Sequence, residues 1–306
     1  MKKFFLTATV LLFLLGCILV YQNIAYNDKK LHIIICDVGQ GDAILIRTPQ
    51  GSDILIDGGP DDKILSCLGR HMPFYDRTID MVVLTHPQKD HMKGILSVID
   101  RYTIKHFVIG IEGSDSQEYQ QLISKLNSKK IPLKNLFAGD KFRMGELQVG
   151  VFWPDKSWVF DHLSVEADRL KKDQIGSAGQ AVLGLSTEDD LNQFSFYLKL
   201  GYRNFSALMT GDGDSTIQNQ IMDVSGIQNV QVLKIPHHGS KTALSSGFLD
   251  RLKPALAVIS VGKNSFGHPT NEILKQLSDR KIEVKRTDRD GDVNVVSDGL
   301  SWKIVY

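Results

Sequence analysis

Two histidines and an aspartate follow an apolar run at a spacing that suits a metal ion. The run Val83 to Thr85 predicts a buried strand, and the loop after it carries His86, Asp90 and His91. Imidazole and carboxylate groups are ligands for borderline divalent cations such as zinc or manganese. A polar loop that binds no metal is the competing interpretation, because a short motif of this kind also occurs by chance.

Two later segments repeat this pattern of an apolar strand that runs into metal-competent residues. Phe205 to Met209 leads to Asp212, and Val230 to Ile235 leads to a histidine pair and the Gly239-Ser240 turn. A carboxylate and further histidines complete a two-metal site, in which a shared aspartate bridges ions about 3.5–4 Å apart. The sequence therefore predicts a metal centre formed by His86, Asp90, His91, Asp212 and His237, with His238 as an alternative ligand or as a neighbour of the ligands.

Six short segments together resemble the metallo-β-lactamase-fold hydrolases, and more narrowly their ComEC-type branch, the hydrolase domain attached to the DNA-uptake channel of competent bacteria. The resemblance covers about Leu31 to Tyr306 and implies an α/β fold, the αββα sandwich, with its ligands on loops at one edge. The segments are Asp37-Val38-Gly39-Gln40-Gly41-Asp42, Ile54-Leu55-Ile56-Asp57-Gly58-Gly59, Thr85-His86-Pro87 with Asp90-His91, Thr210-Gly211-Asp212, His237-His238-Gly239-Ser240 and Gly267-His268-Pro269.

The resemblance also implies that Asp37 and Asp57 support the ligands from behind. One departure concerns Gln88, which stands where these hydrolases usually carry a ligand two residues after the first histidine. A neutral amide is a poor ligand, and no histidine is evident for the ligand that normally precedes the Thr-Gly-Asp segment. We therefore expect one or two ions per chain, Zn²⁺ or Mn²⁺, with the first position weak or empty.

Metal-activated hydroxide attacking a phosphodiester is the reaction that this set of residues suggests. A bound divalent ion lowers the pKa of water from about 15.7 toward 7 and neutralises charge on the phosphoryl group. We expect Asp90 and His268 to act in catalysis, with His268 as a phosphate contact or as the proton donor to the leaving oxygen. The amides of Gly239 and Ser240, and the Ser240 hydroxyl, would contact a non-bridging oxygen.

The N-terminus predicts one apolar helix that anchors the chain in a membrane. Lys2 and Lys3 are followed by a charge-free stretch, and the run Phe4 to Tyr21 is as long as the shortest bilayer spans. We expect an anchor or uncleaved signal over residues 1–27 and one hydrolase domain over 28–306. The signal-like pattern and the resemblance both place the domain outside the cytoplasm, although lipidation at Cys17 or secretion would also fit.

The cysteine content, the net charge and the other sequence patterns say less about the function of the chain. With three cysteines no disulfide framework is expected, and Cys36 fits a buried thiol in an apolar strand. A net charge of +1 gives no global attraction for nucleic acid. Strands are expected at 31–36, 43–47 and 53–56, a packing helix within 114–130, and an insertion at 161–193 that shapes one rim of the site.

Three functions remain open at this level. The first is a membrane-anchored, extracytoplasmic nuclease or phosphodiesterase acting on DNA, which would need a separate uptake channel for any role in import, since one apolar segment cannot move DNA. The second is another metallohydrolase, such as a phosphorylcholine esterase or a lactone or lactam hydrolase. The third is a non-catalytic metal-binding module, an interpretation supported by the neutral Gln88 at a position where a ligand is usual. The sequence shows no motif for a protein partner.

Overall fold

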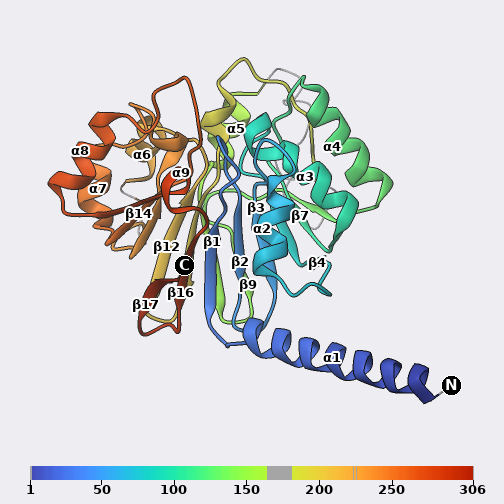
Figure 1. Ribbon diagram of the computed structural model, residues 1–306. Helices are drawn as coiled ribbons and strands as arrows, with labels where there is room; N and C mark the ends of the chain where they lie inside the picture. The colour runs from blue at the N-terminus through green and yellow to red at the C-terminus, as the bar shows by residue number, and fades with distance from the viewer. Residues whose placement is uncertain (1, 164–180, 223, 225, 306) are drawn as a thin grey trace.

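Two β-sheets pack face to face between two layers of helices in a computed structural model that describes residues 2–163, 181–222, 224 and 226–305 (Figure 1). The α-helices among these residues are α1 (Lys2–Tyr26), α2 (Lys63–His71), α3 (Lys89–Arg101), α4 (Gln117–Ser128), α5 (Lys156–Asp161), α6 (Ser215–Ile221), α7 (Ser246–Leu252), α8 (Asn271–Asp279) and α9 (Thr287–Asp290), and the 3₁₀ helices include η3 (Leu191–Phe194) and η4 (Pro236–Gly239).

The first sheet has eight strands in the order β17-β16-β1-β2-β3-β5-β7-β8. Its N-terminal strands are the three that the sequence predicted. The bounds are β1 (Leu31–Ile35), β2 (Ile44–Arg47), β3 (Asp53–Ile56), β5 (Met81–Val83), β7 (Phe107–Val108), β8 (Leu133–Lys134), β16 (Val293–Ser297) and β17 (Trp302–Val305), while β4 (Thr78–Ile79) and β6 (Thr103–Ile104) form a separate pair.

The second sheet has seven strands in the order β15-β14-β13-β12-β11-β10-β9. Strands β9 to β12 are antiparallel neighbours, and β12 to β15 run parallel. The bounds are β9 (Lys141–Met144), β10 (Leu147–Trp153), β11 (Tyr197–Tyr202), β12 (Phe205–Thr210), β13 (Val232–Lys234), β14 (Leu256–Ile259) and β15 (Glu283–Arg286).

The main core lies between the sheets, because alternate residues of each strand point inward. In β10, for example, Leu147, Val149 and Val151 are buried while the residues between them are more exposed. A second core lies between the first sheet and helices α2 to α4, and a third between the second sheet and helices α6 to α8. This four-layer arrangement confirms the predicted αββα sandwich (Figure 1).

The candidate site residues all follow strands that end at one edge of the sandwich. Parallel strands β3 and β5 end before Asp57 and His86, and parallel strands β12 and β13 end before Asp212 and His238. Because carboxyl ends of neighbouring parallel strands meet at the same edge, loops from both sheets converge there. Helix α3 is drawn close to this edge by Gly94, where a Cβ would overlap the carbonyl of Gly58.

Helix α1 projects from the opposite edge of the sandwich, beside the start of β1 (Figure 1). Within it, Lys2–Gln22 is long and apolar enough to cross a membrane by length and composition, as a signal sequence also is. Its last turn contacts the domain, because the Tyr26 hydroxyl donates to the carbonyl of Arg70 and the Arg47 guanidinium lies over the Tyr26 ring. The predicted apolar N-terminal helix is therefore present.

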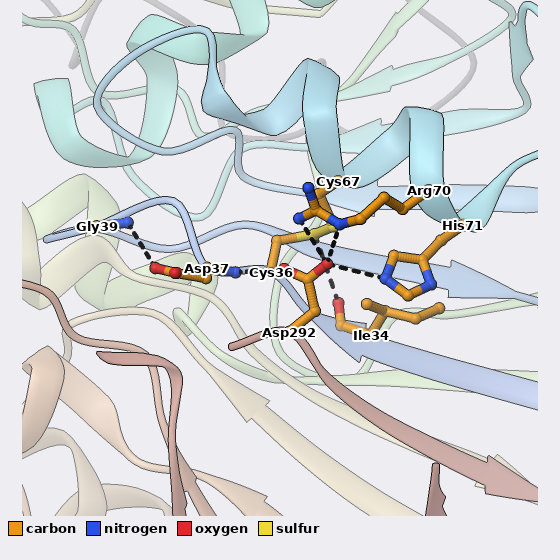
Figure 2. The surroundings of a disulfide bond; sticks show 8 residues. All are labelled: Ile34, Cys36, Asp37, Gly39, Cys67, Arg70, His71 and Asp292. Atoms are coloured by element: carbon orange, nitrogen blue, oxygen red, sulfur yellow. Dashed lines mark hydrogen bonds and ion pairs between the residues drawn. A yellow bond between two sulfur atoms is a disulfide. The ribbon is translucent and has the colours of Figure 1, made fainter. Parts of the chain in front are cut away.

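The expectation that Cys36 is a free buried thiol was wrong, because Cys36 forms a disulfide with Cys67 of α2 (Figure 2). The bond joins the end of β1 to the helix that covers it. Beside it, the Asp292 carboxylate accepts hydrogen bonds from Arg70 and His71 and from the backbone amide of Asp37. Cys67, His71 and Asp292 lie close enough to suggest metal ligands, but the Cys67 sulfur is used in the disulfide.

Part of the predicted insertion at 161–193 lies outside the described residues, so its contribution to the rim is described only at its two ends. There, His162 stacks on Trp158 and hydrogen-bonds to its carbonyl, and η3 leads into β11. These contacts give His162 a packing role.

Candidate metal centre

Four side chains from both halves of the sandwich converge on one point. Asp90, His91, Asp212 and His238 each offer a ligand atom, and these atoms lie within 4.8 Å of one another. The Oδ2 atom of Asp212 is 3.3 Å from Nε2 of His91 and 3.2 Å from Nε2 of His238. Nε2 of His238 also lies 3.4 Å from Oδ2 of Asp90. Two carboxylates and two imidazoles form a donor set that suits zinc or manganese.

Both histidines in this cluster are held in the tautomer that a metal ligand needs. Nδ1 of His91 donates to Asp57 at 2.8 Å, and Asp57 also accepts from the amide and hydroxyl of Thr85. Nδ1 of His238 donates to the carbonyl of Ser260 at 2.8 Å. With each Nδ1 donating to its own acceptor, each Nε2 is the nitrogen that faces the centre and can bind an ion. Nε2 of His91 is buried without a hydrogen-bond partner among the described residues, as expected for a ligand atom.

The local backbone places these ligands. Asp90 and His91 are in the first turn of α3, where the positive end of the helix dipole favours the Asp90 carboxylate. His237 and His238 both have left-handed backbone angles, with φ of 47° and 52°. Two consecutive non-glycine residues in this region are strained, and such strain is concentrated at functional sites. The turn buries His238 against Asp212 while His237 remains partly exposed.

Asp212 has one oxygen directed at the histidines and the other held by the protein. Oδ1 accepts from the backbone amide of His237 at 3.2 Å and lies 3.7 Å from the ammonium of Lys234. The Asp212 amide donates to the Ser195 hydroxyl. Asp212 therefore offers one oxygen, Oδ2, to an ion at this centre.

A fully buried ion pair between Lys234 and Asp42 lies behind the ligands. Burial lowers the pKa of Lys234, but Asp42 and Asp212 raise it above its usual value, so the ammonium stays charged. Asp42 also lies 3.5 Å from Nδ1 of His238 and 3.9 Å from Nδ1 of His91. The sequence signal for this pair is a lysine inside the apolar run of β13, and no pattern in the sequence links it to Asp42.

His86 lies next to the cluster but is outside the group of four. Its Nδ1 is 3.2 Å from the Ser195 hydroxyl and 3.1 Å from the Thr85 hydroxyl. Because that Thr85 hydroxyl already donates to Asp57, it accepts from His86, and Nε2 of His86 keeps a lone pair. This Nε2 is buried without a partner among the described residues. Burial and the neighbouring His91 lower the pKa of His86 to about 3, so its imidazole is neutral.

A cavity of about 420 Å³ opens onto the cluster. His237, predicted as a ligand, lines this cavity together with Gln88 and His268, whereas His238, predicted as the alternative, is in the cluster. The ring centroids of His237 and His268 are 5.7 Å apart. Burial and the two neighbouring histidines lower the pKa of His268.

Two expected roles do not match the observed contacts. The exposed Asp37 carboxylate accepts from the amide of Gly39 in its own loop, and Asp42 is the carboxylate of this segment that lies behind the ligands. The amide of Ser240 donates to the carbonyl of His237 and is not free for a substrate oxygen, while the Ser240 hydroxyl lies 3.5 Å from that of Thr242. Gly239 has a φ of 79° and packs against Pro269, so it shapes the turn.

Comparisons with known proteins agree with this fold and suggest a lineage. The metallo-β-lactamase fold protein YhfI from Bacillus subtilis superimposes with a TM-score of 0.52 over 87% of this chain and 100% of that chain, at 10% identity. ComE operon protein 3 of Bacillus subtilis is 24% identical over 94% of this chain and 34% of its own length. Competence protein ComA of Neisseria gonorrhoeae is 24% identical over 89% of this chain and 33% of its own length.

The chain has the metallo-β-lactamase fold and is similar in sequence to ComEC-type competence proteins. Both the predicted resemblance and the predicted fold are thereby confirmed. None of the protein-family models matches the chain. The chain spans about a third of the length of the curated relatives that it matches, so the activities and partners of those longer proteins are not transferred to it directly.

Proposed function

We propose that this chain is a membrane-anchored, metal-dependent phosphodiesterase that cleaves DNA outside the cytoplasm. The observation that carries the proposal is the convergence of Asp90, His91, Asp212 and His238, with both imidazoles fixed in the ligand tautomer. Such support behind the ligands raises metal affinity and is typical of functional metal sites.

The residues of the site have distinct roles in this reaction. Asp90, His91, Asp212 and His238 would hold a divalent ion, which supplies a Lewis acid and a nucleophile at neutral pH when bound. The amide of His237 and the ammonium of Lys234 fix the second oxygen of Asp212. His268, which lines the cavity, would contact the phosphate or protonate the leaving oxygen.

We infer one firmly held ion per chain. Around His86, Nε2 of this histidine is the available ligand atom, and the neighbouring side chains of Gln88 and Ser195 are neutral. A hydroxyl and an amide are weak ligands for zinc and manganese compared with imidazole and carboxylate. Asp212, which would bridge two ions, has its second oxygen engaged by protein donors. These contacts support the expectation that the first metal position is weak.

DNA is the proposed substrate because of the relatives rather than the charge of the chain. They are named ComE operon protein 3, competence protein ComA and, in Haemophilus influenzae, recombination protein 2. Among the described residues one helix is long and apolar enough to span a membrane, so these residues alone do not form an uptake channel.

The disulfide supports a location outside the cytoplasm. Disulfide bonds persist in oxidising compartments and are rare in the reducing cytoplasm of mesophiles. The Cys36–Cys67 bond, together with the apolar α1, is consistent with a domain held by α1 on the outer side of a bacterial membrane.

Hydrolysis assays on the detergent-solubilised full chain test the proposal. We expect Zn²⁺- or Mn²⁺-dependent cleavage of plasmid and single-stranded DNA that a chelator abolishes and that His91→Ala removes. The matched control is His162→Ala, because His162 lies in α5's C-terminal turn and stacks on Trp158. Cleavage of phosphorylcholine esters or lactones but not DNA would favour another metallohydrolase. Metal binding without turnover of any ester would favour a binding module.

A further inference from the structure

An exposed aromatic ring, Phe266, stands at the rim of the cavity that contains the candidate metal ligands. The same cavity is lined by Asp90, Asp212 and His238. Phe266 is 71% exposed, and outside α1 it is the most exposed aromatic side chain among the described residues, ahead of Phe74 and Tyr75 at 48% each. Phe266 adds little to the core, and its place in the lining of this cavity makes its ring available to a molecule that also reaches the candidate ligands.

The turn that carries Phe266 is held by its own hydrogen bonds. The Asn264 side chain accepts from the amides of Phe266 and His268 and donates to the carbonyls of Gly262 and His268. The Phe266 ring also stacks against the His268 ring, with centroids 5.7 Å apart and planes inclined by 29°. The ring is therefore presented to solvent by a preorganised turn and does not need ordering when a ligand binds.

A row of rings connects Phe266 with the metal ligands. His268 neighbours His237 with ring centroids 5.7 Å apart, and His237 neighbours the ligand His238 at 6.4 Å. A group bound against Phe266 would thus belong to the same substrate as a phosphate held at the metal centre.

We propose that Phe266 is a stacking platform for the nucleobase next to the scissile phosphate. This inference rests on the proposed phosphodiesterase function and narrows its substrate to nucleic acid with unpaired bases. Bases stack on aromatic side chains with little regard to sequence, because every base has a π-face. In duplex DNA the base faces are already stacked, so the platform favours single strands and frayed ends over paired DNA.

The geometry favours a flat base over the quaternary ammonium of a phosphorylcholine ester. Proteins bind choline groups in cages of several aromatic rings. Among the residues that line this cavity, Phe266 is the one with a benzene ring. A single ring with an exposed face suits a planar partner.

Two phosphodiesters with the same leaving group isolate the contribution of the base. We expect Phe266→Ala in the full chain to lower kcat/KM for the p-nitrophenyl ester of thymidine 5′-phosphate by about 5- to 150-fold, the range for one stacked base. The methyl p-nitrophenyl ester, which has no base, should change by less than about twofold, since surface substitutions are otherwise small in effect. Phe266→Trp should restore kcat/KM for the nucleoside ester, and Phe74→Ala should have the wild-type kcat/KM for both esters.

Binding without turnover separates this inference from the proposed function. Fluorescence anisotropy of a labelled oligothymidine with the metal-free full chain should give a weaker Kd for Phe266→Ala than for wild type or Phe74→Ala. An equal loss of kcat/KM on both esters in Phe266→Ala, or an unchanged Kd for the oligothymidine, would contradict the stacking role of Phe266. A selective loss on p-nitrophenyl phosphorylcholine would assign the ring to choline instead. Wild type that binds the oligothymidine through Phe266 but hydrolyses neither ester would refute the phosphodiesterase alone.

Discussion

Three of the four candidate ligands are oriented by a neighbour that the metal ion would not touch. Asp57 fixes His91, the Ser260 carbonyl fixes His238, and the His237 amide fixes Asp212. The Lys234–Asp42 pair lies behind all of them. The properties of the centre therefore depend on residues outside the ligand set.

Lys234→Met should destabilise the fold, because it leaves the fully buried Asp42 carboxylate without its cation. Breaking one side of a buried pair costs about 3–5 kcal/mol. Urea denaturation followed by circular dichroism measures the loss. The exposed Lys241 provides the control, and Lys241→Met should be neutral. Equal stability of the two variants would show that the ion pair is not formed.

Metal affinity should rise with pH across the neutral range. In the metal-free protein, burial lowers the pKa of His238, but Asp212 and Asp90 raise it to about 10. Below that pH the imidazole is protonated, and binding an ion must displace the proton. The apparent affinity should increase about tenfold or more per pH unit between about pH 6 and pH 8. Competition with a chelating dye measures this slope, and a flat profile would contradict the assignment of His238 as a ligand.

At the scale of elements, the sequence predicted those ligands that follow an apolar strand directly. His91 and Asp212 could be found because each follows an apolar strand and lies in a recognisable segment. His237 and His238 could not be ranked, because the left-handed turn that decides which of them points inward has no clear sequence signal. The pairs Lys234–Asp42 and Cys36–Cys67 depend on how distant elements pack, which spacing along one chain does not reveal.

The disulfide between β1 and α2 should contribute measurably to stability. Closing a loop of 31 residues is worth about 3–4 kcal/mol through the entropy of the unfolded chain. The double variant Cys36→Ala with Cys67→Ala should lose about that much in urea unfolding, and wild type should lose it when reductant is added. Cys17→Ser, an exposed change in α1, serves as the control. Reductant-insensitive unfolding of wild type would show that these cysteines are not paired.

At the scale of the whole molecule, α1 and the metal centre lie at opposite edges of the sandwich (Figure 1). If α1 spans a membrane, the metal centre lies at the edge of the sandwich that is remote from the start of this helix in the domain. The sequence was sufficient for the apolar helix and for the αββα class, because both follow from patterns that extend over many residues.

Deleting residues 1–27 should leave a soluble domain with unchanged kcat/KM, because α1 supplies none of the clustered ligands. The loss of the Tyr26 contacts to Arg70 and Arg47 should cost about 1 kcal/mol or less, as expected for a partly exposed hydrogen bond. Ester hydrolysis by the two purified forms provides the comparison. A truncated protein that is folded but inactive would place part of the site on α1.

Metal content tests the central claim most directly: that Asp90, His91, Asp212 and His238 hold one divalent ion. Elemental analysis after dialysis should find about one zinc or manganese ion per chain in wild type, because one complete set of ligands is present. His238→Ala should lose that ion, whereas its sequence neighbour His237→Ala should keep it. Retention of the ion in His238→Ala together with its loss in His237→Ala, or two ions in wild type, would contradict the centre described.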